Sequence, residues 1–179
     1  LASDVTFAST TGINLTANSI SQANGSDFAL TNNAALSLSA GITVGTDFAN
    51  GTGSPASLTV SSGTTTFAND IDLSAGSFNH SGGTVTLSAA NKGGAAAELS
   101  GSRTYNNLTF TGPVNVNGSN TITNLTATAA SLEGKTITFA AGTDQTVSGN
   151  LQLSGTADED NKRLVLTGTN WTITSTGTH

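Results

Sequence analysis

The stretch SRTYNNLTFTG, residues 102–112, decides the fold expected for this chain. Its apolar residues Leu108 and Phe110 lie two positions apart, with a threonine between them and a glycine shortly after. Such alternation places apolar side chains on one face of a strand and polar side chains on the other. The stretch therefore predicts a short β-strand that ends in a tight turn.

The same spacing of apolar pairs recurs along the whole chain, and bends rich in Gly and Asn separate the pairs. No sustained helical stripe accompanies them, and residues 90–100 are predicted to form a short turn or insertion. The predicted pairs are Val5/Phe7, Ile13/Leu15, Phe28/Leu30, Leu36/Leu38, Ile42/Val44, Leu58/Val60, Ile71/Leu73, Val85/Leu87, Leu108/Phe110, Val114/Val116, Ile137/Phe139, Leu151/Leu153, Leu164/Leu166 and Trp171/Ile173.

Many short strands without helices leave two main architectures, a sandwich or barrel and a stacked solenoid. A sandwich needs larger residues to fill the space between two facing sheets. Here one apolar pair is usually followed by a turn, which favours an all-β parallel β-helix. The intervals Leu36–Leu58, Leu108–Leu125 and Leu151–Leu164 are 22, 17 and 13 residues, so irregular coils with short loops are expected.

The composition narrows the classes of function. The chain has 179 residues, a net charge of −6 and only 5 Lys and Arg residues, which argues against nucleic acid and anionic membranes as partners. It has no cysteine, so a disulfide scaffold or thiolate metal site is excluded. No apolar run approaches the ~20 residues of a membrane-spanning helix.

We expect residues 1–179 to be a single solenoid segment. No composition shift marks a domain boundary, and the chain begins with Leu and contains no Met. These features favour a piece of a longer repeat protein, in which neighbouring coils would cover the strand edges at both ends.

The stretches TYNNLTFTG, NTITNLTATA, GKTITFAAGTDQTVSGNLQLSG and LVLTGTNWTITSTGT suggest a family. They resemble repeats of filamentous-haemagglutinin-like proteins and autotransporter passengers, most clearly over residues 100–179. The resemblance implies a right-handed parallel β-helix exported to the bacterial cell surface, often as an adhesin stalk. It carries no catalytic residue over to this chain.

Acidic residues offer the first candidate chemistry. Asp70 and Asp72 would share a strand face, and paired carboxylates can cleave sugars by general acid catalysis. A solvated outer face beside inward Ile71 and Leu73 is the preferred interpretation. Asp27 and Asp47 are likewise interpreted as solvated loop residues.

Metal and nucleophile sites receive little support. Residues 157–163 gather Asp158, Glu159, Asp160 and Asn161, but they lack the spacing of a calcium loop. We interpret them as a surface loop that Lys162 and Arg163 partly neutralise. His80, expected in a bend, and His179 form no zinc constellation. We therefore predict no catalytic, cofactor or metal site.

Threonine and aromatic residues suggest binding surfaces. Thr-x-Thr at 84–86, 109–111, 121–123, 136–138 and 172–174 would suit an ice-binding face if it were regular, but the intervals vary. Asparagine sequons at Asn14, Asn24, Asn50, Asn79, Asn107, Asn117, Asn124 and Asn170 are expected to arise by chance. Phe7, Phe28, Phe48, Phe67, Phe78, Phe110 and Phe139 are predicted as core stacks, and Trp171 is also predicted to be buried.

The function expected from these features is that of a structural or adhesive segment of a secreted bacterial surface β-solenoid, not an enzyme. The expected partners are neighbouring repeats of the same chain and host or environmental glycans, and end-to-end self-association is a further expectation. The alternatives are a carbohydrate-active β-helix lyase or hydrolase and a glycan- or ice-binding module.

Overall fold

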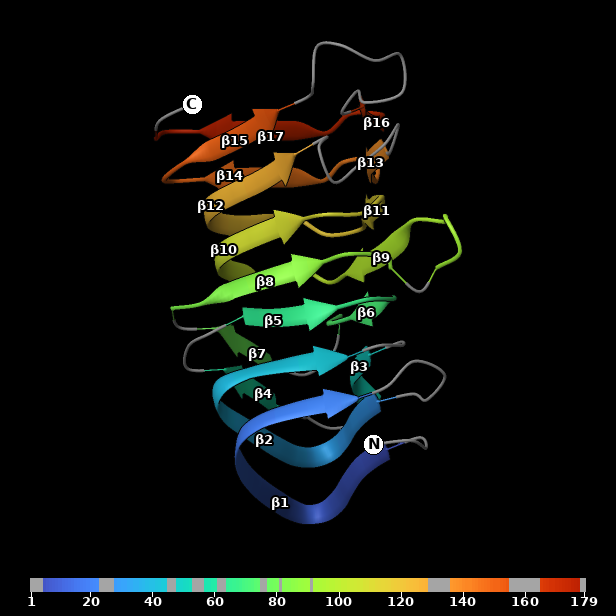
Figure 1. Ribbon diagram of the computed structural model, residues 1–179, viewed down its shortest axis with the longest axis vertical. Coiled ribbons are helices and arrows are strands. Elements are labelled where there is room, and N and C mark those ends of the chain that lie inside the picture. The colour runs from blue at the N-terminus through green and yellow to red at the C-terminus, as the bar shows by residue number, and fades with distance from the viewer. Residues whose placement is uncertain are drawn as a thin grey trace.

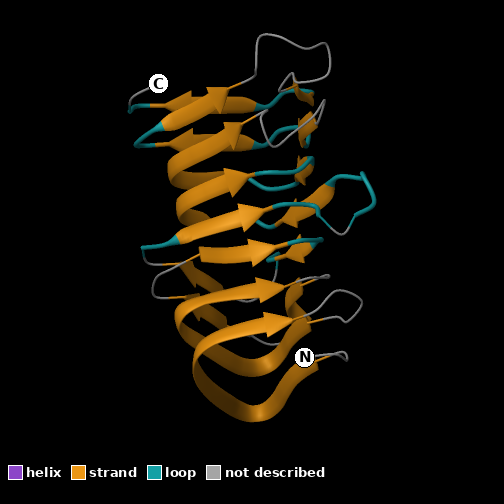
Figure 2. Cartoon of the chain, in the orientation of Figure 1, coloured by secondary structure: helices purple, strands orange, loops and turns teal. Residues whose placement is uncertain are grey.

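The chain forms a stack of parallel β-strands in the computed structural model (Figure 1). The structure describes residues 5–22, 28–44, 48–52, 57–60, 64–74, 77–80, 82–90, 92–128, 136–154 and 165–177, with side chains from residue 64 onward except at 128. Strands and loops make up this part of the chain, in which there is no helix (Figure 2). The predicted all-β class is therefore confirmed.

Most strands are short, whereas the first two bend around the stack. In chain order the strands are β1 (Val5–Gln22), β2 (Phe28–Val44), β3 (Phe48–Thr52), β4 (Ser57–Val60), β5 (Thr64–Phe67), β6 (Ile71–Asp72), β7 (Ser77–His80), β8 (Thr84–Leu87), β9 (Ala97–Ser100), β10 (Thr104–Phe110), β11 (Val114–Val116), β12 (Asn120–Thr128), β13 (Thr136–Phe139), β14 (Asp144–Val147), β15 (Leu151–Ser154), β16 (Val165–Gly168) and β17 (Thr172–Ser175).

Successive strands wind around three faces, which we name by their position in Figure 1. The side face carries β3, β6, β9, β11, β13 and β16; the back face carries β4, β7, β14 and β17; the front face carries β5, β8 and β15. β10 and β12 begin on the back face and end on the front face.

The coil is right-handed, as the resemblance implies. The chain rises from its N-terminus while it crosses the back face from right to left and the front face from left to right (Figure 1). Each ladder between neighbouring coils is parallel, for example β5 with β8 and β11 with β13. Right-handed connections are the rule for parallel strands. The predicted parallel β-helix is therefore confirmed.

The coils differ in length although their strands stay in register. Glu98 and Asn115 face each other on neighbouring coils and lie 17 residues apart, whereas Asp144 and Thr172 lie 28 apart. The turns between the strands absorb this difference. The prediction of irregular coils with short loops is therefore confirmed.

Two of the three predicted leucine steps are coil steps. Leu36 pairs with Leu58, and Leu108 pairs with Leu125. The third step is wrong, because Leu151 pairs with Leu125 on the coil before it. Its other member, Leu164, lies outside the described residues.

The core consists of inward side chains stacked in columns. On the front face one column runs through Phe67, Leu87, Phe110 and Ala127, and on the side face another runs through Ile71, Leu99, Val116 and Phe139. All eight side chains are at most 2 % exposed. Burial of apolar surface contributes roughly 25 cal/mol per Å², so these columns are the main source of cohesion between coils.

Glycine lets two coils approach closely at one corner. A Cβ atom added to Gly118 would lie only 2.2 Å from the backbone oxygen of Gly101 on the coil below. Any larger residue at this corner would force the two coils apart.

Several strands escaped prediction because their inward positions are polar or small. β5 buries Thr65, β7 buries His80 and β14 buries Gln145. The prediction of a turn or insertion over 90–100 is partly wrong, because β9 places Ala97 and Leu99 in the core. In each case alternation of apolar residues is too weak to mark a strand.

Candidate functional site

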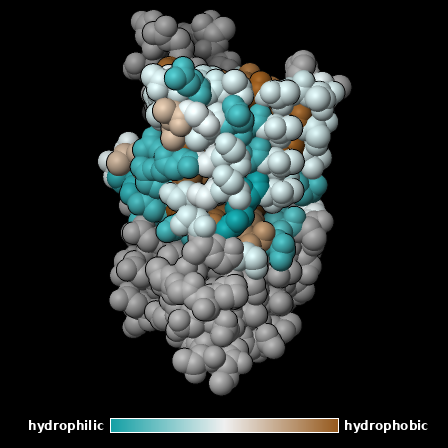
Figure 3. Space-filling model, turned by 180° about the vertical axis from the view of Figure 1, so that it is seen from behind, coloured by the Kyte–Doolittle hydropathy of each residue, from teal (hydrophilic) through white to brown (hydrophobic). Residues whose placement is uncertain are grey.

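The back face carries two columns of short polar side chains, which we call the back-face array. The first column consists of Ser102, Ser119, Asp144 and Thr172, and the second of Thr104, Thr121, Thr146 and Thr174. All eight residues are exposed. Seen from behind, the described part of the molecule is mostly pale or hydrophilic, with hydrophobic residues in small patches (Figure 3).

Hydrogen bonds between coils fix the first column of the array. The Ser119 amide donates to Ser102 Oγ at 3.0 Å, and the Asp144 amide donates to Ser119 Oγ at 3.0 Å. Thr172 Oγ1 donates to Asp144 Oδ1 at 2.5 Å. Each side chain is therefore held by the next coil, so the polar atoms repeat at the spacing of the strands.

Beneath the array lies a buried ladder of amide side chains. Asn120 Nδ2 donates to Gln145 Oε1 at 2.9 Å, and Gln145 Nε2 donates to the Gly118 oxygen at 2.8 Å. The Arg103 amide donates to Asn120 Oδ1 at 3.0 Å. Because buried amides are costly without partners, this ladder favours one register between three coils.

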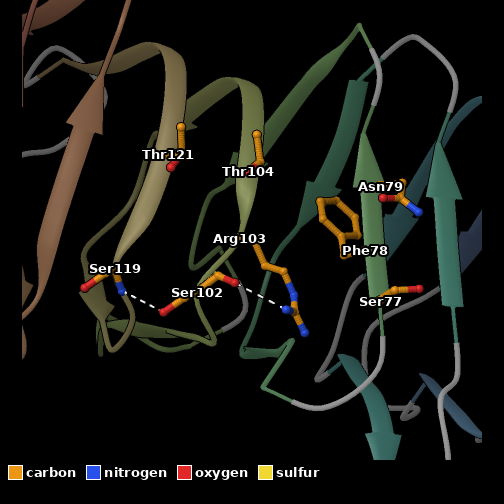
Figure 4. Close-up of a pocket in the computed structure, with 8 residues that line it drawn as sticks. All are labelled: Ser77, Phe78, Asn79, Ser102, Arg103, Thr104, Ser119 and Thr121. Atoms are coloured by element: carbon orange, nitrogen blue, oxygen red, sulfur yellow. Dashed lines mark hydrogen bonds between the residues drawn. The ribbon is translucent and has the colours of Figure 1, made fainter.

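A groove of about 460 Å³ opens at one end of the array, between β7 and β10 (Figure 4). β7 pairs with β4, and the start of β10 pairs with β12, so no ladder joins β7 to β10 among the described strands. The Arg103 guanidinium donates to the carbonyl oxygens of Leu73 and Ser102. The groove is lined by Ser77, Phe78, Asn79, Ser102, Arg103, Thr104, Ser119 and Thr121.

Two titratable side chains lie inside the coil near this groove. His80 is 7 % exposed, its ring stacks on Phe78 at 6.0 Å, and neither ring nitrogen has a hydrogen-bond partner among the described residues. Burial lowers the pKa of His80. Tyr105 is fully buried, and burial raises the pKa of its hydroxyl. The prediction that His80 lies in a bend is wrong, because it ends β7.

Asp70 and Asp72 make separate structural contacts. Asp70 forms an ion pair with Lys92 at 2.9 Å and accepts a hydrogen bond from the Glu98 amide. Asp72 accepts hydrogen bonds from the amide and hydroxyl of Ser74. Asp70 thus anchors the turn between β8 and β9, while Asp72 stabilises its own turn.

Several predicted residues lie outside the described part of the chain. They are Asp27, Asp47, His179 and the loop 157–163 with Asp158, Glu159, Asp160, Asn161, Lys162 and Arg163. Within the described ranges, no three His, Asp or Glu side chains gather as a metal site would require.

The sequon asparagines take part in the scaffold at two positions. Asn107 Nδ2 donates to the Gly83 oxygen at 3.0 Å, and Asn124 Nδ2 donates to Asn107 Oδ1 at 2.7 Å. Asn124 Oδ1 in turn accepts from the Asn150 amide. These side chains form a second ladder, which links successive coils.

The aromatic predictions can be compared with the structure from Phe67 onward. Phe67, Phe78, Phe110 and Phe139 are buried, as predicted. Trp171 is only partly buried, and it stacks on Phe139 with ring centroids 4.6 Å apart. Phe7, Phe28 and Phe48 occupy strands whose side chains lie outside the described set.

Irregular sequence intervals suggested that the threonines form no regular array, and for the back face this expectation is wrong. Steps of 17, 25 and 28 residues separate successive members of the first column. The extra residues lie in turns, so the exposed positions remain aligned. Ser102, Ser119 and Asp144 were missed because the search was for Thr-x-Thr; their signal is a polar residue three positions before inward Tyr105, Ile122 and Val147.

Comparisons with protein-family models, curated proteins and solved structures found no match to this chain. Across the described residues, no helix is long and apolar enough to cross a membrane.

Proposed function

We propose that this chain is a structural and adhesive segment of a bacterial surface β-solenoid. The observation that carries the proposal is the continuous parallel stacking of coils, from β1 with β2 to β14 with β17. Such a stack holds its two ends apart and presents broad walls on which weak contacts can add up. The resemblance of residues 100–179 to adhesin repeats supports export to the cell surface.

Side chains on the last described coils support stacking of a further coil or a second copy. Leu153 and Val165 are 36 % and 41 % exposed, and Leu151, Leu166 and Ile173 are only partly buried. β15, β16 and β17 each pair with one earlier strand, and no described strand pairs with their other edge. Apolar side chains beside open strand edges favour addition of another coil.

Mechanical unfolding tests the structural part of the proposal. Pulling on the two ends should detach coils in steps, and a coil of 17 to 28 residues should release roughly 60–100 Å at about 3.5 Å per residue. The length released by each step is measured by single-molecule force spectroscopy. A single rupture that releases the whole chain at once would contradict a stack of separable coils.

Two assays test the adhesive part and the enzymatic alternative. Beads coated with the folded chain should be retained on glycan-coated surfaces more strongly than beads coated with heat-unfolded chain. Incubation with acidic and neutral polysaccharides should release no reducing ends. Equal retention of both kinds of bead would refute adhesion, and released reducing ends would replace the proposal with a carbohydrate-active enzyme.

A further inference from the structure

The back-face array repeats in two dimensions. Neighbouring coils lie about 4.8 Å apart, and the two columns, two residues apart along each strand, are separated by about 6.6 Å. Within a column, Thr104, Thr121, Thr146 and Thr174 follow one another in ladder register. The array is therefore a small lattice of polar side chains.

The side chains of this lattice are short and well oriented. Threonine is branched at Cβ, so its hydroxyl and methyl groups adopt few rotamers. Three of the four side chains in the other column are tied to the next coil by hydrogen bonds that begin or end on Ser102, Ser119 and Asp144. A binding partner would lose little conformational entropy in ordering such a surface.

The charge of the array limits the choice of partner. Seven of its eight side chains are neutral hydroxyls, and the carboxylate of Asp144 is engaged by Thr172 Oγ1. Because the face is exposed and carries a single acid, it matches a neutral hydrogen-bonding solid better than a charged polymer.

Ice has matching spacings. In ice each oxygen has four tetrahedral neighbours at about 2.75 Å, so second neighbours lie about 4.5 Å apart and layers repeat after about 7.3 Å. The misfit to the coil spacing is about 0.3 Å per coil, or about 0.5 Å at either end of four coils centred on the lattice. This lies within the normal spread of O–H···O distances.

We propose that the back-face array binds the surface of ice crystals. The hydroxyl groups of the two columns would take the positions of lattice waters, while the threonine methyl groups fill the spaces between them. This activity is additional to the structural role, because it depends on exposed side chains that contribute nothing to the apolar core.

The decisive pair of variants places the same substitution on two faces. Thr121→Tyr puts a bulky ring in the middle of the back-face array, whereas Thr109→Tyr puts it on the front face, in the column Thr66, Thr86, Thr109 and Thr126. The gap between freezing and melting of a seeded ice crystal is measured for each chain, with serum albumin as a non-binding reference. Thermal melts and circular dichroism show whether each variant is folded.

The wild-type chain and Thr109→Tyr should produce a freezing gap and shaped crystals, and Thr121→Tyr should reduce the gap at least severalfold. Thr121→Val, which keeps the shape but removes a hydroxyl, provides a second test if the tyrosine variant does not fold. A wild-type gap no larger than that of albumin would overturn the proposal. So would equal gaps for the back-face and front-face variants.

Discussion

Asn120 and Gln145 join two coils through a buried hydrogen bond of 2.9 Å. Both side chains are 2 % exposed, and both lie directly beneath the back-face array. A solenoid held only by apolar columns would tolerate slippage, since one aliphatic rung resembles the next. The amide pair penalises slippage, because a shifted register would leave buried polar groups without partners.

Truncation of this pair is the first prediction. Asn120→Ala should lower the free energy of unfolding by about 1–3 kcal/mol, because Gln145 loses its partner in the interior. Chemical denaturation measures the change. Asn117→Ala removes an exposed asparagine that contacts Glu98 and should cost about 0.5 kcal/mol or less; equal losses would show that the buried ladder adds no stability.

The apolar columns give the second prediction. Phe110→Ala should cost about 3–5 kcal/mol, since Phe110 is 2 % exposed between Leu87 and Ala127. Leu151→Ala should cost less, about 1–2 kcal/mol, because Leu151 is only partly buried. The ranking is checked by urea unfolding of both variants, and a larger loss for Leu151→Ala would contradict the described core.

His80 gives a prediction about pH. Burial lowers its pKa in the folded state, so the unfolded chain binds a proton more readily. The stability contributed by neutral His80 is therefore present above about pH 6.5 and is lost as pH falls from there toward the lowered pKa. Unfolding free energies at pH 7.5 and 5.5 should differ more for the wild type than for His80→Phe; an equal difference would remove His80 from the pH response.

The close corner at Gly118 gives the fourth prediction. Gly118→Ala should cost about 1–3 kcal/mol, because its Cβ would collide with the Gly101 oxygen. Gly142→Ala is the matched control, since its Cβ would meet open space and only its φ of +75° is unfavourable. Thermal unfolding compares the two variants, and a smaller loss at Gly118 would indicate that the corner can open.

Strand positions were predictable wherever two apolar residues alternate, as at Val114/Val116 and Ile137/Phe139. They were not predictable where the inward residue is polar. Gln145 resembles a surface residue in the sequence, and only its hydrogen bonds to Asn120 and Gly118 explain its burial. Local alternation does not report a partner that lies on another coil.

The back-face array was hidden from the sequence for a related reason. Ser119 and Asp144 are 25 residues apart, whereas Ser102 and Ser119 are 17 apart. A search for one fixed repeat length cannot align these positions. Their alignment follows from parallel pairing of the strands, which the apolar residues determine and the turn lengths do not disturb.

The excursion between β8 and β9 shows what this independence permits. The chain leaves the stack after Leu87 and returns at Ala97 (Figure 1), yet Val85 still pairs with Leu108 of the following coil. Foreign peptides grafted into this excursion should therefore be displayed without loss of folding. In a population of cells, the same corner would let surface epitopes diversify rapidly while the scaffold beneath them is conserved.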